Sequence, residues 1–164
     1  MNTIIKNTGA ASLVVNTTLL RIKLIDGATM PDYATGGAAC FDIRALDNGT
    51  PHPNDDHACV YRTGLIFEVP EGYAMMIYSR SGHGFKDALR LSNCVGVIDS
   101  DYRGEVKVSL RFDASGDRRC VKVRAGDRIA QAMLVPVPHV VMVQVDELSQ
   151  TERGAGGFGS TGAA

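Results

Sequence analysis

The chain has 164 residues, a hydrophobic content of 45% and a formal net charge of −1. This length fits one compact domain with its own core, and no apolar run is long enough to span a bilayer. The near-zero charge excludes attraction to nucleic acid or to an anionic membrane by a global field, so a polyanionic ligand would need local cations.

The cysteines and the N-terminus indicate where the protein works. Four cysteines are scattered without a Cys-x-x-Cys pair, namely Cys40, Cys59, Cys94 and Cys120. Such spacing is not typical of zinc sites, and we expect reduced thiols. The first fifteen residues carry one Lys among short apolar patches and make a poor signal peptide. We therefore expect a cytoplasmic protein, or one in the host cytoplasm or nucleus if its source is viral.

Taken in chain order, the pattern predicts a loose polar extension over 1–17 and then strands almost throughout. The expected strands cover 19–25, 60–69, 73–78, 95–98, 105–112, 129–137 and 140–148. In the stretch EVKVSLRF, Val106, Val108, Leu110 and Phe112 alternate with polar residues, which predicts one buried row. Gly-, Asn- and Pro-containing turn signals separate the strands, and no long stretch shows a helical period. The sequence therefore predicts an all-β sandwich, barrel or jelly-roll-like fold.

The segment 93–104 (NCVGVIDSDYRG) combines strand and turn signals with two carboxylates. Its pattern predicts a hairpin with a polar turn over 99–102 and a return after Gly104. Asp99 and Asp101 are two positions apart, so they would share a face of an extended stretch. From the residues alone, these acids are either turn-capping groups or chemically active carboxylates.

Five motifs in order make the sequence resemble the trimeric dUTPase family. They are 31–45 (PDYATGGAACFDIRA), 78–82 (YSRSG), 93–104 (NCVGVIDSDYRG), 125–137 (AGDRIAQAMLVPV) and 153–162 (RGAGGFGSTG). The resemblance implies a jelly-roll-like β-barrel over 18–152, assembled as a homotrimer. It also implies that 153–164, by composition a flexible tail, is an arm exchanged between subunits to close over the active site.

The resemblance further implies hydrolysis of dUTP to dUMP and pyrophosphate by water attack on the α-phosphorus. This reaction keeps uracil out of DNA and supplies dUMP for thymidylate synthesis. Asp99 matches the base that activates water, and Tyr102 matches the residue that excludes a ribose 2′-hydroxyl. The uracil would bind the segment's main chain and one amide side chain, at Asn93, Gly96, Val97 and Ile98. Lys107 is either a nucleotide contact or a solvated lysine.

The other motifs supply the groups that a triphosphate needs. Phosphate contacts are implied for Arg80, Ser81, Gly82 and Gln131, although Gln131 would also suit a polar contact to a neighbouring subunit. In the arm, Phe158 would cover the uracil and Arg153 would pair with the γ-phosphate. Further phosphate contacts in the arm are implied for Gly159, Ser160 and Thr161. The implied cofactor is Mg²⁺, held by the phosphates and water without a direct protein ligand, with Asp42 in its water network.

Three departures from the family pattern and two rival functions qualify this interpretation. Cys40 replaces a glycine, Ser79 replaces a proline, and His83 replaces an apolar residue. We interpret His83 as a tolerated surface substitution, although a histidine near phosphates could modulate binding by titrating near neutrality. The rival functions are a dCTP deaminase-like enzyme, and a regulatory binding protein built on a dUTPase scaffold.

Overall fold

The computed structural model describes residues 3–4, 14–15, 18–113 and 123–157. Near the N-terminus, β1 (Thr3–Ile4) and β2 (Val14–Val15) pair antiparallel. Within the described ranges, no helix is long and apolar enough to cross a membrane.

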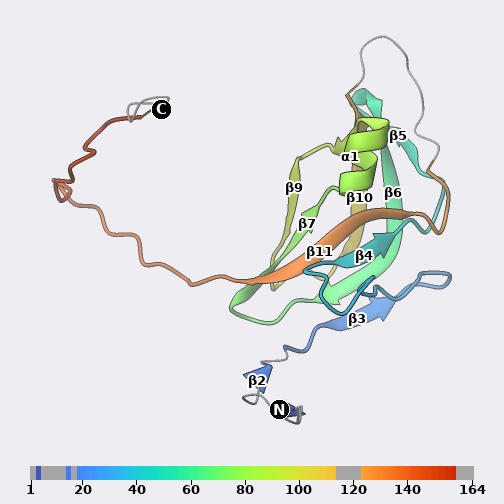
Figure 1. Cartoon of the computed structure of the whole chain (residues 1–164), viewed down its shortest axis with the longest axis horizontal. Coiled ribbons are helices and arrows are strands. Elements are labelled where there is room, and N and C mark those ends of the chain that lie inside the picture. Colours follow the sequence, from blue (N-terminus) through green and yellow to red (C-terminus); the bar gives the residue numbers. More distant parts are fainter. Residues whose placement is uncertain (1–2, 5–13, 16–17, 114–122, 158–164) are drawn as a thin grey trace.

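Two antiparallel sheets form the body of the protein (Figure 1). The first has the order β3 (Arg21–Leu24), β6 (Asp55–Glu68), β10 (Glu105–Phe112) and β8 (Leu89–Leu91), and β5 (Thr50–His52) also pairs with β6. The second has the order β4 (Phe41–Arg44), β11 (Arg128–Pro136), β7 (Tyr73–Tyr78) and β9 (Val95–Ile98). The expected all-β class is thus confirmed, with antiparallel pairing throughout.

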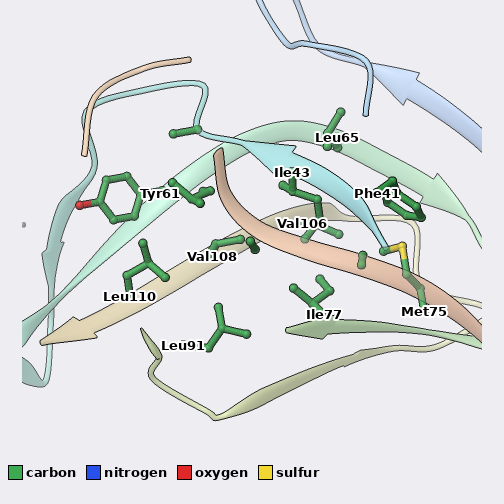
Figure 2. Close-up of a cluster of buried hydrophobic side chains, with 14 of the residues drawn as sticks. Phe41, Ile43, Tyr61, Leu65, Met75, Ile77, Leu91, Val106, Val108 and Leu110 are labelled. Atoms are coloured by element: carbon green, nitrogen blue, oxygen red, sulfur yellow. The ribbon is translucent and has the colours of Figure 1, made fainter. Parts of the chain in front are cut away.

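The hydrophobic core contains inward-facing side chains of both sheets (Figure 2). Ile43, Leu65 and Met75 are fully buried there. The predicted alternation in β10 is confirmed for Val106 and Val108, which are 2% exposed and lie in the core, whereas Phe112 at the strand's end is only half-buried. Each such buried aliphatic side chain stabilises the fold by about 1.5–3 kcal/mol.

Two segments differ from the expectation. A short helix, α1 (Ser81–Asp87), follows β7 and ends at Ala88, which adopts a left-handed conformation (φ 51°). Its two glycines are poor helix formers and none of its residues is buried. Neither helix propensity nor an apolar stripe in the sequence therefore predicts this helix.

The predicted strand over 140–148 is absent from the described chain. After β11 the backbone runs away from the body, and Val141 and Met142 are 90% and 91% exposed (Figure 1). The residues have high strand propensity, but a strand also needs a neighbouring strand to pair with, and this segment pairs with none of the described strands.

Candidate active site

The segment 93–104 does not form the paired hairpin that its pattern predicts. Its strands β9 and β10 have the expected bounds, but β9 pairs with β7 in the second sheet, whereas β10 pairs with β6 and β8 in the first. The turn between them is closed by the Tyr102 N–H, which donates to the Asp99 carbonyl (3.3 Å). The two strands therefore diverge from this turn into different sheets.

This divergence leaves the edge of the second sheet, at β9, facing an open space beside β10. Because β9 is the last strand of its sheet, alternate N–H and C=O groups along it point away from β7 and are available to a ligand. A pocket of about 330 Å³ lies between the strands and is lined by residues that include Asn93, Gly96, Val97, Ile98 and Lys107. We call it the base pocket.

A second hollow adjoins the base pocket at the turn. It measures about 500 Å³ and shares Val97, Ile98 and Lys107 with the base pocket. The rest of its wall consists of Asp99, Tyr102, Glu105 and Val106. Tyr102 is 43% exposed, and its hydroxyl donates to the Glu105 carbonyl (3.2 Å). An exposed carboxylate and a fixed aromatic ring thus lie beside a pocket that borders the unpaired edge of β9.

The predicted phosphate residues gather elsewhere, around the start of α1. Arg80 precedes the helix in an extended conformation, and Ser81 and Gly82 occupy the exposed first turn, which no side chain caps. The Gln131 side chain donates to the Ser79 carbonyl (2.9 Å), which brings the second and fourth motifs together. The Ser79 hydroxyl accepts from the Leu91 N–H (2.9 Å), so this departure from the family pattern links β7 to β8.

A buried carboxylate anchors the same region. Asp42 on β4 is 9% exposed; its Oδ1 accepts from Arg80 Nε (3.2 Å) and its Oδ2 from Arg128 Nη1 (2.9 Å). The Arg80 Nη1 group also donates to the Arg128 carbonyl (3.1 Å). Sequence reasoning did not find Arg128, which lies within the fourth motif but carries no signal beyond its charge. One carboxylate between two guanidinium groups leaves a net charge of +1. We use the name phosphate cluster for six residues, namely Asp42, Arg80, Ser81, Gly82, Arg128 and Gln131.

Two of the departures change local ionisation. His83 is half-buried rather than a surface residue, and its buried Nδ1 atom has no hydrogen-bond partner among the residues that the structure describes. Burial, and then the nearby Arg80 charge, lower the pKa of His83, which favours the neutral imidazole. Burial, and then the Asp42 charge, raise the pKa of Cys40, which keeps this residue a thiol.

The turn that carries Asp99 and the phosphate cluster of one chain lie toward opposite ends of β7 and β9. In the β7–β9 register Val95 pairs with Tyr78 and Ile98 with Met75, so Asp99 continues β9 toward Ala74 while Arg80 continues β7 in the opposite direction. At about 3.3 Å per residue, six residues of strand separate the two ends by roughly 20 Å. The structure thus brings together the residues within each group, but it places Asp99 far from Arg80.

The C-terminal arm touches neither group in the described residues. Arg153 is exposed, and its Nε atom donates to the Gly156 carbonyl (2.9 Å) in a local turn. The other predicted arm contacts lie outside the described residues, namely Phe158, Gly159, Ser160 and Thr161. Across the described ranges, no group of three or more His, Cys, Asp or Glu side chains is placed to hold a metal ion.

The fold and the pocket define an all-β protein with a candidate site between two sheets, at the edge formed by β9. A family model places the protein more closely: the dUTPase model matches residues 26–162, and the chain belongs to the dUTPase family.

Curated relatives match over most of their length. The chain is 43% identical over 140 residues to the deoxyuridine 5′-triphosphate nucleotidohydrolase of Nautilia profundicola, covering 85% of this chain and 95% of the relative. It is 40% identical over 159 residues to the enzyme of the same name from Brucella melitensis, covering 96% and 99%.

Solved structures agree on the fold. The Staphylococcus bacteriophage 80alpha dUTPase with dUPNHPP matches with a TM-score of 0.77 and 28% identity, over 89% of this chain and 99% of that chain. A mutant dUTPase from phage phi11 of S. aureus, whose structure reveals the coordination of a structural Mg(II) ion, matches with a TM-score of 0.64. The match covers 79% of this chain and 98% of that chain. Its 24% identity shows a likeness of fold alone.

Proposed function

We propose that this protein hydrolyses dUTP to dUMP and pyrophosphate, and that the uracil binds between β9 and β10. The observation that carries the proposal is the divergence of these strands into different sheets, which leaves main-chain groups facing a pocket beside Asp99. The reaction removes a precursor of uracil in DNA and yields dUMP for thymidylate synthesis.

Uracil carries two carbonyl acceptors that flank one N–H donor, much like a backbone amide. The unpaired edge of β9 at Gly96, Val97 and Ile98 can complement this pattern without polar side chains, and the Asn93 amide adds a further partner. Cytosine would present an amino group where uracil presents a carbonyl, and this mismatch would leave buried groups unpaired. The pocket therefore favours uracil.

Asp99 acts as the general base in this proposal. It is exposed at the turn, where a carboxylate can accept a hydrogen bond from a water molecule and orient it toward the α-phosphorus. As water attacks, the P–O bond to the leaving pyrophosphate breaks and the proton passes to the carboxylate. The Tyr102 ring, held through its hydroxyl, covers the deoxyribose and leaves no room for a 2′-hydroxyl.

The phosphate cluster receives the triphosphate. Arg80 and Gln131 donate to the phosphate oxygens, and the main chain at Ser81 and Gly82 approaches them closely. Lys107 lies on the shared wall of the two hollows and adds a cation on the base side. When bound, Mg²⁺ would neutralise phosphate charge; it prefers phosphate and water oxygens, so a site without a carboxylate cage suits it.

The separation within one chain supports a shared active site. Because roughly 20 Å lie between Asp99 and Arg80 of one chain, we infer that one subunit supplies Asp99 with the base pocket and another supplies the phosphate cluster. The exposed apolar segment 137–148 is suited to pair with a partner subunit, since a monomer would leave Val140 to Val143 in water. We propose a homotrimer in which this segment and the 153–164 arm pass to neighbouring subunits.

The arm closes the site. Glycines between Arg153 and Thr161 allow it to order only over bound substrate, so that Arg153 would pair with the γ-phosphate and Phe158 would cover the uracil. Gly159, Ser160 and Thr161 would add phosphate contacts. This part of the proposal rests on the motif and on Arg153 lying free of the body.

The test is product release from dUTP, dTTP, dCTP and UTP, each assayed with and without Mg²⁺. We expect pyrophosphate from dUTP alone, at a rate that rises with Mg²⁺. Ammonia from dCTP would instead indicate a deaminase, and tight dUTP binding without turnover would indicate a regulatory binding protein. Either result would contradict the proposed function.

A further inference from the structure

Arg90 lies between the second and third motifs and contacts the turn 91–94, which leads into β9. Its Nη1 atom donates to the Leu91 carbonyl (2.9 Å) and to the Ser92 carbonyl (3.4 Å). The same atom lies 3.8 Å from the Cys94 Sγ atom. One guanidinium group thus contacts three of the four residues of the turn.

The end of this turn is strained backbone. Cys94 adopts a left-handed conformation (φ 65°), and the Val95 N–H donates across it to the Asn93 carbonyl (2.7 Å). A hydrogen bond that spans one residue with positive φ forms a tight turn that is rare in proteins. A residue other than glycine keeps such a conformation only where its surroundings hold it in place. The turn therefore needs support from side chains such as Arg90.

Arg90 is itself held from the other side. Its Nε atom donates to Asp113 Oδ2 (2.5 Å), and Asp113 Oδ1 lies 3.5 Å from Arg111 Nε. Arg111 stands directly opposite Arg90 in the β8–β10 register and also pairs with Asp55 (2.9 Å). Two carboxylates thus balance two arginines that would otherwise repel each other across the strands. Because the guanidinium is planar, its bond to Asp113 also sets the direction in which Nη1 meets the turn.

The start of the turn is fixed to the wall of the base pocket. The hydroxyls of Ser92 and Ser109 hydrogen-bond to each other (2.7 Å), and the Leu91 N–H donates to the Ser79 hydroxyl (2.9 Å). Leu91, Ser92 and Asn93 all line the base pocket, and Asn93 is the exposed one of the three. The direction of the Asn93 side chain therefore depends on the backbone of the turn.

We propose that Arg90 is a positioning residue for the nucleobase, which holds the turn 91–94 so that Asn93 and the edge of β9 face the uracil. The inference rests on the proposed function and adds a residue that lies outside all five motifs. Without the guanidinium group, the strained turn would populate other conformations. Only the fraction of molecules with Asn93 in place would bind the base at full strength, which lowers the apparent affinity.

The first experiment replaces Arg90 by methionine, which keeps an unbranched stem and removes the guanidinium group. Backbone strain of the kind seen at Cys94 corresponds to a population change of about tenfold. We therefore expect KM for dUTP to rise about tenfold, with kcat changed less. By calorimetry, the analogue dUpNHpp should bind about tenfold more weakly. The inhibition constant of inorganic pyrophosphate, which has no base, should stay unchanged.

A double-mutant cycle shows whether Arg90 acts through Asn93. If it does, Arg90→Met should raise KM clearly less in an Asn93→Ala background than in the wild type, so the two effects are less than additive. Fully additive effects, or a pyrophosphate inhibition constant that rises as much as the dUpNHpp dissociation constant, would overturn the proposal. If wild-type protein does not hydrolyse dUTP, the proposed function fails instead, so the two failures are distinguishable.

Two further variants complete the design. Arg21→Met is the matched control, because Arg21 lies in the same sheet and pairs with Glu68 (2.9 Å) at an exposed position. It should leave KM within about twofold, since exposed ion pairs contribute little. If Arg90→Met does not fold, Arg90→Lys keeps the charge, but its single nitrogen cannot hold both Asp113 and the turn. This variant should raise KM about fivefold with pyrophosphate inhibition unchanged, and wild-type kinetics in it would refute the proposal.

Discussion

The ring of Tyr102 lies where a side chain at residue 104 would be. A Cβ atom at Gly104 would be 2.6 Å from Cζ of Tyr102, closer than such atoms approach in proteins, and 3.0 Å from Cε2. The absence of a side chain at Gly104 therefore allows Tyr102 to reach the Glu105 carbonyl and to lie along the turn of the candidate site.

Gly104→Ala should displace the Tyr102 ring and weaken sugar discrimination. We expect kcat/KM for dUTP to fall about tenfold and that for UTP to fall less, because the ring would no longer cover the sugar closely. Steady-state kinetics with both nucleotides measure the ratio of kcat/KM for dUTP to kcat/KM for UTP. Gly37→Ala is the matched control, since a Cβ there meets nothing within 4 Å and both rates should persist. Unchanged discrimination in Gly104→Ala would contradict the role of the ring.

Asp99→Asn should abolish most turnover while leaving substrate binding intact. Removal of a general base typically lowers kcat by about 10²- to 10⁴-fold, and the base pocket next to it is unchanged. Single-turnover assays give the rate, and calorimetry with dUpNHpp gives the affinity. Asp101→Asn, two positions further along the same turn, should retain activity. Wild-type turnover in Asp99→Asn would remove this residue as the base.

Truncation before Arg153 should separate assembly from catalysis. The shortened chain keeps all described strands, so it should remain a folded trimer, with turnover reduced at least about a hundredfold because the site cannot close. Light scattering reports the assembly and pyrophosphate release reports the activity. Deletion of Ala163 and Ala164 alone is the control. Full activity after the longer deletion would refute the role of the arm.

The apolar segment that leaves the body should hold the subunits together. Val141 and Met142 are almost fully exposed in one chain, so a charge at either position is harmless to a monomer. In an exchanged strand the two side chains point to opposite faces, and at least one of Val141→Asp and Met142→Asp should weaken the trimer. Sedimentation at falling concentration measures this. Unaltered trimers in both variants would indicate that the segment stays in solvent.

His83 should make the protein less stable in mild acid. Because its pKa is lowered in the folded state, the unfolded chain takes up the proton first as the pH falls below the ordinary value of 6.5. The contribution of neutral His83 to the free energy of unfolding is therefore fully present above pH 6.5, and it is lost as the pH falls through the folded-state pKa. Denaturant unfolding at pH 7.5 and 5.0 should show a smaller loss for His83→Leu than for the wild type. Equal losses would show that His83 titrates alike in both states.

Much of the fold follows from local sequence. The period-two alternation in 105–112, and the bounds of β7 and β9, come from residues a few positions apart, because side chains on a strand alternate between faces. The five motifs likewise identify the family without any knowledge of the fold.

Tertiary structure decided the features that depend on distant partners. A turn flanked by strands looks like a paired hairpin in sequence, yet β7 and β6 compete for β9 and β10, and their pairing opens the base pocket. Asp42 and Arg80 meet because β4 and β7 both flank β11. Neither relationship has a local signature, since hydrogen bonds between strands and ion pairs join residues far apart in the chain.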